Sequence, residues 1–193
     1  PCLHMGHDEA ELFFGTILKN EQEKIASDPS IDQFLVIKNS LEIVIKEKGE
    51  EFLYYMIIEH PSIFHKIYNQ GSERLKGILP KMRNYLTYYD LLRTGIYYQD
   101  PKGKAYYDDP TVKAFGNIMM ATNPDVSFAQ RVSHAKALGE LGGGHTSLAI
   151  NILLVMEKAG SGLSDYELES CKKALDELGY NSWYSIHGPV VRF

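Results

Sequence analysis

Apolar residues recur every three or four positions along most of the chain, which is the spacing that places side chains on one face of a helix. The pattern is interrupted at prolines and glycines, which commonly end helices. It predicts eight longer helical segments, over residues 8–26, 30–49, 50–60, 80–92, 109–119, 125–141, 146–156 and 164–179. Shorter helical pieces are predicted around residues 63–69 and 72–79. Strands and helices do not alternate in this pattern, so a doubly wound α/β fold is disfavoured.

Polar residues at the starts of several segments are of the types that cap helix N-termini. Their side-chain oxygen accepts a hydrogen bond from a backbone amide of the first turn, and a Glu or Gln three residues later completes a capping box. Gln33 and Glu167 have this spacing from a preceding serine. The predicted N-caps are Ser30, Asp125, Thr146 and Ser164, and Asp109-Pro110 is predicted to begin a further helix.

One stretch departs from the helical pattern. Residues 96–99 and 104–107 are rich in tyrosine and flank the sequence DPKG, whose proline and glycine suit a type I turn. We therefore predict a short β-hairpin near residues 96–107 and, from residue 180 onward, an extended C-terminal tail. The predicted fold class is all-α, a multi-helix bundle of about eight or nine helices that carries this hairpin in a single domain over residues 6–193.

Tyrosine is concentrated in the middle of the chain. Ten of the 13 tyrosines lie between Tyr54 and Tyr107, and eight of them form adjacent pairs. Because neighbouring residues of a helix or strand point in different directions, several of these rings are expected to be exposed. The same region is basic: residues 61–104 carry eight basic and three acidic side chains, against five and twelve in residues 1–60. A core that uses tyrosine as filler is the competing interpretation.

The tyrosine-rich, basic region is the leading candidate site, because tyrosine and arginine are enriched at the centres of protein interfaces. The predicted function is a non-catalytic helical binding or adaptor domain whose partner is another protein. The same side chains could also stack on nucleic acid or contact anionic lipid, which is a further interpretation. The predicted partner-binding residues are Tyr88, Tyr89, Arg93, Tyr97, Tyr98, Lys102, Lys104, Tyr106 and Tyr107.

Histidines near carboxylates suggest the alternative of a metal- or ligand-binding helical enzyme. Neither of two such groups has the Glu-x-x-His spacing of di-metal helix bundles, so satisfied or solvated histidines are the competing interpretation and no cofactor is predicted. The N-terminal Cys2, His4 and His7 have side chains that chelate soft or borderline metals. The two groups are Glu59, His60 and His65, and His134, Glu140 and His145.

The glycine-rich sequence GELGGGHT at residues 139–146 has the spacing of a phosphate-binding loop, with His145 in place of the lysine. A buried strand precedes such a loop, whereas a helix is predicted here, so a simple connection between helices is the favoured interpretation. Backbone amides at the start of the next helix form a weaker candidate for an anion site. The residues of that site are Gly143, Gly144, His145 and Thr146.

Composition narrows these choices. The formal net charge is −5, which argues against a surface built for nucleic acid, and no apolar run reaches the ~20 residues that span a bilayer. Two cysteines are a poor basis for disulfides, so a reducing, cytoplasmic compartment is expected. Cys171 lies at helical spacing among leucines and is predicted to be buried and inert.

We interpret residues 1–5, which include the dipeptide His4-Met5, as a cloning remnant, and the rest as a candidate domain of a larger protein.

Overall fold

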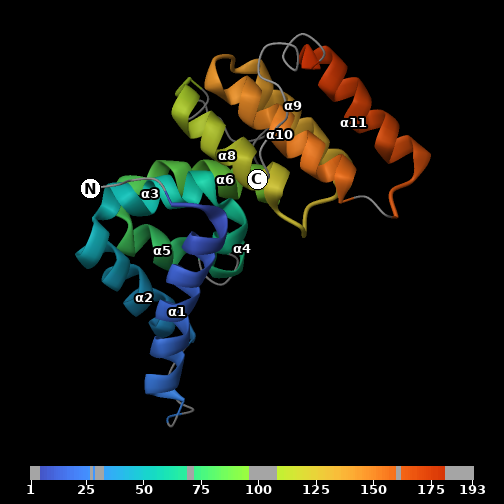
Figure 1. The fold of residues 1–193 in the computed structure, drawn as a ribbon. Coiled ribbons are helices and arrows are strands. Elements are labelled where there is room, and N and C mark those ends of the chain that lie inside the picture. The colour runs from blue at the N-terminus through green and yellow to red at the C-terminus, as the bar shows by residue number, and fades with distance from the viewer. Residues whose placement is uncertain are drawn as a thin grey trace. The chain divides into compact units, whose positions relative to one another are not determined.

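A computed structural model describes residues 5–26, 28, 33–68, 72–95, 108–159 and 162–180 (Figure 1). The all-α prediction is confirmed for these residues, which form helices and turns and contain no strand. In the same part of the chain, every helix is too short or too polar to cross a membrane. The hairpin predicted at residues 96–107 and the tail beyond residue 180 lie outside the described residues.

The chain divides into two compact units, Pro1–Arg83 and Asn84–Phe193, which we call the N-terminal and the C-terminal unit. The N-terminal unit contains α1 (His7–Ile25), α2 (Gln33–Lys48), α3 (Glu50–Glu59), α4 (Pro61–Tyr68), α5 (Ser72–Ile78) and the 3-10 turn η1 (Pro80–Met82). The C-terminal unit contains α6 (Arg83–Thr94) from its second residue onward, together with α8 (Pro110–Thr122), α9 (Phe128–Glu140), α10 (Gly144–Lys158) and α11 (Asp165–Glu177). One domain can comprise two such units, so the single-domain interpretation stays a prediction.

Aromatic contacts hold the N-terminal unit together. The buried ring of Phe14 in α1 lies 5.2 Å from the ring of Phe64 in α4. One residue earlier, Phe13 meets Phe52 of α3 edge-on at 6.2 Å. These two pairs fix α1 on the α3–α4 corner, where aromatic side chains bury a large apolar area. Gly49 ends α2 with a φ of +93°, which confirms the predicted break between the second and third segments.

In the C-terminal unit, α9 packs against α8, α10 and α11 (Figure 1). Its core includes Phe115, Ile118, Leu138 and Leu153, all essentially inaccessible to solvent. Cys171 of α11 is buried as predicted, and this burial raises the pKa of its thiol to about 11. The thiolate, which is the nucleophilic form, is therefore scarce at neutral pH.

Two of the predicted helix starts are confirmed. The side chain of Asp109 accepts a hydrogen bond from the amide of Thr111 at the start of α8. Ser164 and Glu167 form a complete capping box at the start of α11. Both signals are local in sequence, because cap and partner are two or three residues apart.

Two other predicted caps are wrong. The cap of α9 is Ser127 rather than Asp125, whose amide instead donates to the side chain of Asn123 and closes the preceding turn. Helix α10 begins at Gly144 rather than after Thr146, because Gly143, with a φ of +58°, leads the backbone into the helix earlier. Positive φ is strained for residues with a side chain, so glycine permits this early start.

Candidate functional site

A groove of about 280 Å³ lies between α6, α8 and α9 of the C-terminal unit, and we call it the His134 groove. Both apolar and polar side chains line it. They are Tyr88 and Leu92 of α6, Lys113 and Asn117 of α8, Ser133, His134, Ala137 and Glu140 of α9, and Leu141. Two polar groups in it, Asn117 and His134, are paired with each other.

The side chain of Asn117 is oriented by two hydrogen bonds. Its Nδ2 donates to the carbonyl oxygen of Lys113, one turn earlier in α8, over 2.9 Å. This contact directs Oδ1 toward Nδ1 of His134, 2.8 Å away. Because an amide oxygen can only accept, the proton of the neutral imidazole must be on Nδ1. Nε2 of His134 therefore keeps its lone pair and can accept a hydrogen bond.

Burial acts on the same imidazole. It lowers the pKa of His134 below the ordinary value of 6.5, because a charged ring loses hydration in this environment. The ring is therefore neutral at pH 7, with Nδ1 donating to Asn117. Asn117 itself is only 6% exposed, so its carbonyl has little access to water as an alternative partner. Together these features fix the tautomer and the orientation of the His134 ring, which lines the groove.

Tyrosines build the contact of α6 with α8 beside the groove. The ring of Tyr88 lies on Gly116, where an added Cβ atom would be only 2.4 Å from Cδ1 of the ring. The hydroxyl of Tyr89 accepts a hydrogen bond of 2.8 Å from Nδ2 of Asn123. Tyr85 meets Phe115 edge-on at 5.6 Å. The wall of the groove is therefore fixed by interlocking aromatic contacts rather than by a flexible loop.

The expectation that the two rings of an adjacent pair cannot both be buried is wrong for Tyr88 and Tyr89, which are 3% and 0% exposed. Their side chains leave α6 about 100° apart, yet both contact α8. Tyr88 lies on Gly116 near the middle of α8, and Tyr89 reaches Asn123 at its C-terminal end. These two residues are thus part of the core of the C-terminal unit. Arg93 is exposed at the end of α6, with its guanidinium 3.4 Å from the carboxylate of Asp90. The other predicted partner-binding residues, Tyr97, Tyr98, Lys102, Lys104, Tyr106 and Tyr107, lie outside the described residues.

The two predicted histidine groups belong to different units. His134 and Glu140 both line the His134 groove, whereas His145 belongs to the first turn of α10. His60 and His65 are buried in the N-terminal unit, with Glu59 at the end of α3. Within the part of the chain that the structure describes, no three His, Cys, Asp or Glu side chains gather as metal ligands.

The glycine-rich turn offers fewer free amides than the sequence suggests. The amide of His145 donates to the carbonyl of Gly142, and that of Thr146 donates to Gly143, each over 3.2 Å. The Thr146 hydroxyl also donates back to the carbonyl of Gly139. An anion site needs several unpaired amides that converge on one point, and two of the four expected here are already used.

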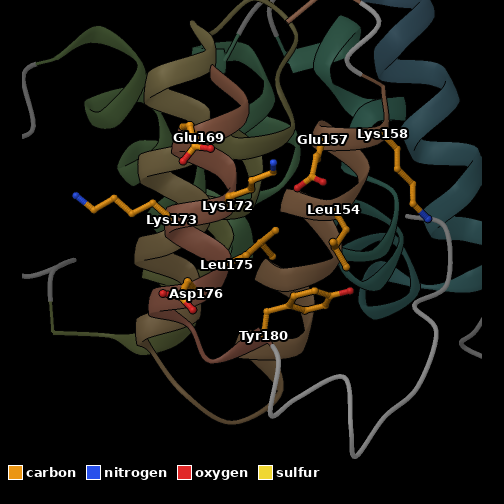
Figure 2. A pocket seen from close by; sticks show the side chains of 9 residues that line it. All are labelled: Leu154, Glu157, Lys158, Glu169, Lys172, Lys173, Leu175, Asp176 and Tyr180. Carbon is orange, nitrogen blue, oxygen red and sulfur yellow. The ribbon is translucent and has the colours of Figure 1, made fainter. Parts of the chain in front are cut away.

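A wider surface hollow of about 730 Å³ lies between α10 and α11 (Figure 2). Leu154, Leu175 and Tyr180 form its apolar part, while Lys158 and Lys173 extend outward on opposite sides. Its remaining lining residues are Glu157, Glu169, Lys172 and Asp176. Three basic and three acidic side chains leave this rim without net charge, so it does not select a ligand by charge. We call it the α10–α11 hollow.

Neither depression was predicted from the sequence, because each depends on which helices pack together. Asn117 and Gly116 carry no motif; only the pairing of α8 with α6 and α9 gives them their roles. His134 was singled out in the sequence, but as a candidate metal ligand rather than as the partner of an amide. Comparisons of the chain with protein-family models, curated protein sequences and solved structures give no match, so the interpretation of the site rests on its geometry.

Proposed function

We propose that this chain is a non-catalytic helical binding domain that holds one aromatic side chain of a partner protein in the His134 groove. The observation that carries the proposal is the hydrogen bond between Asn117 and His134, which leaves one oriented acceptor, Nε2, on a neutral ring. An acceptor of defined position discriminates between ligands, because a ligand without a donor leaves a polar group unpaired.

The size of the groove favours a single side chain over a small molecule. Its volume of about 280 Å³ is below the range of roughly 300–1,000 Å³ that is usual for small-molecule pockets. One large side chain of a protein partner needs less space than a nucleotide or a coenzyme. Large side chains that insert into such pockets supply most of the binding free energy of many protein interfaces.

The chemistry of the lining favours an aromatic side chain with a hydrogen-bond donor. Tyr88, Leu92 and Ala137 offer apolar contacts, and Nε2 of His134 accepts. Tryptophan has an indole N–H that only donates, and tyrosine has a hydroxyl that can donate. Both residue types also bury a large area at low cost in conformational entropy, which is typical of interface anchors.

The tyrosine-rich residues 97–107 remain part of this proposal as the outer portion of the same partner surface. Helix α6 lines the groove and ends at Thr94, so these residues follow directly from it in the chain. We propose that they form the hairpin suggested by their turn sequence, and that Arg93, Lys102 and Lys104 add electrostatic attraction for an acidic partner. The scarcity of cysteine favours a cytoplasmic setting for this interaction.

The test is a titration of the full chain, followed by NMR, with the blocked amino acids N-acetyl-tryptophanamide, N-acetyl-tyrosinamide and N-acetyl-phenylalaninamide. We expect the first two to shift the signals of the His134 ring and of the Asn117 amide at lower concentration than the third, which has no side-chain donor. The His134→Phe variant should remove this preference, because it removes Nε2 and keeps a ring.

Tyr180→Ala in the α10–α11 hollow is the matched control, since it removes an aromatic ring from the other depression of the same unit. It should leave the titration unchanged. Equal responses to all three compounds, or signal changes confined to the α10–α11 hollow, would overturn the proposed function.

A further inference from the structure

Two histidines of the N-terminal unit face each other through the same ring nitrogen. His7 is the first residue of α1, and His60 lies between α3 and α4. Their Nδ1 atoms are 3.3 Å apart, and their ring centroids are 5.3 Å apart with an interplanar angle of 52°. His60 is 7% exposed, whereas the side chain of His7 is 33% exposed, so the pair is reached from the His7 side.

The outer nitrogens of both rings face oxygen atoms. Nε2 of His60 lies 2.8 Å from the carbonyl oxygen of Met5, which can only accept, so this nitrogen carries a proton. Nδ1 of neutral His60 is then a lone pair directed at His7. On the other ring, Nε2 of His7 lies 3.7 Å from the carboxylate of Glu11, one turn further along α1.

The distance between the two Nδ1 atoms matches that between ligands of a tetrahedral metal ion. Zinc binds imidazole nitrogen at about 2.0–2.1 Å, so two such ligands of a tetrahedral ion are about 3.3–3.4 Å apart. Metal-binding histidines also usually donate their other N–H to a backbone carbonyl or a carboxylate, which orients the ring. The Met5 carbonyl has this relation to His60, and the Glu11 carboxylate lies on the corresponding side of His7.

We propose that His7 and His60 bind a divalent transition-metal ion of the zinc class through their Nδ1 atoms. Both rings bind as neutral imidazoles: His60 carries its proton on Nε2, facing the Met5 carbonyl, and the proton on Nδ1 of His7 moves to its Nε2, on the side of Glu11, with no net release of a proton. The described residues supply these two protein ligands, and water completes the coordination on the open His7 side. This site is independent of the binding function proposed for the C-terminal unit.

The experiment uses the full chain after treatment with a chelator that is then removed. Zinc chloride is titrated in competition with a colorimetric zinc indicator. We expect one saturable equivalent of zinc per chain. His7→Ala should weaken the affinity at least about tenfold, and zinc should shift the NMR signals of the His7 and His60 rings.

Controls separate this site from other histidines and from a folding defect. His134→Gln, in the other unit, should bind zinc as the unsubstituted chain does. His60→Gln should also weaken zinc binding, and circular dichroism checks that this variant keeps its helix content. His7→Ala removes the other ligand at a more exposed position, where the substitution disturbs the fold less. Saturable binding that survives His7→Ala, or no saturable binding at all, overturns the proposal. A Cys2→Ser/His4→Ala variant that abolishes binding while His7→Ala does not would likewise overturn the proposal. The zinc ion would then be bound by the N-terminal residues Cys2 and His4 rather than by His7 and His60.

Discussion

The two units of this protein each contain a paired histidine, and the partners differ in kind. In the C-terminal unit, His134 meets the amide of Asn117, and the carbonyl of Lys113 fixes which end of that amide faces the ring. In the N-terminal unit, His7 meets a second imidazole, His60. The first partner presents an amide oxygen, whereas the second presents an imidazole nitrogen, which is a common metal ligand as well as a hydrogen-bond acceptor.

This difference decides what each pair can do. An amide oriented by the backbone allows one tautomer of His134, so Nε2 is always the acceptor while the ring is neutral. Two facing imidazoles can both direct a lone pair on Nδ1 at one metal ion, provided that each ring carries its proton on Nε2. The same residue type therefore forms a selective hydrogen-bond acceptor in one unit and a pair of converging ligand atoms in the other.

The largest expected effect comes from filling the space that Tyr88 occupies on α8. We expect Gly116→Ala to lower the free energy of unfolding by about 2 kcal/mol, because the new Cβ atom would overlap the ring and the helix interior is already well packed. Urea unfolding measures the change. The NMR signals of the His134 ring should shift, while those of His7 and His60 should not.

Gly15→Ala in α1 is the matched control for this prediction. It adds the same methyl group to a helix, but nothing lies within 4 Å of the new Cβ atom. We expect it to stabilise the protein by about 0.5–1 kcal/mol, since alanine favours a helix over glycine. If Gly116→Ala lowers the free energy of unfolding no more than Gly15→Ala does, Tyr88 of α6 does not pack on Gly116 of α8. The described packing of this wall of the His134 groove would then be wrong.

A smaller effect is expected from changing the partner of His134. A carboxylate in place of the amide would stabilise the charged imidazole, so Asn117→Asp should raise the pKa of His134 by about one unit or more, or about 1.4 kcal/mol. The pH titration of the His134 ring signals measures it. Asn117→Ala removes the amide without adding charge and should leave the pKa low, because burial is the cause of its depression. A similar rise in both variants would refute the electrostatic explanation.

The sequence predicts features whose partners are near in the chain. Ser164 finds its capping partner three residues away, and Asp109 finds one two residues away. The helical face that buries Cys171 was also visible, because the spacing of the surrounding leucines is regular. Such local patterns were sufficient to predict an all-α protein and most of its helices.

The candidate site depends on long-range contacts that no local pattern contains. Asn117 and His134 are 17 residues apart, on separate helices, and Tyr89 reaches Asn123 across 34 residues. The burial of both Tyr88 and Tyr89 follows from the packing of α6 on α8, whereas the periodicity of α6 alone predicts that one ring is exposed. His7 and His60 are 53 residues apart, so their convergence could not be read from the sequence.

The smallest expected effect is the dependence of stability on pH that His134 contributes. Its pKa is depressed in the folded protein, so the unfolded chain binds more protons between that lowered pKa and 6.5. The contribution of His134 to stability is therefore fully present above pH 6.5 and is lost as the pH falls from there through the folded pKa. His134→Phe removes this titration, although it also leaves Asn117 unpaired, which lowers stability at every pH. We therefore expect the difference in unfolding free energy between the unsubstituted chain and the variant to rise with pH between 5 and 7 and to level off above. A constant difference over that range would mean that the ring of His134 is as well hydrated in the folded protein as in the unfolded chain.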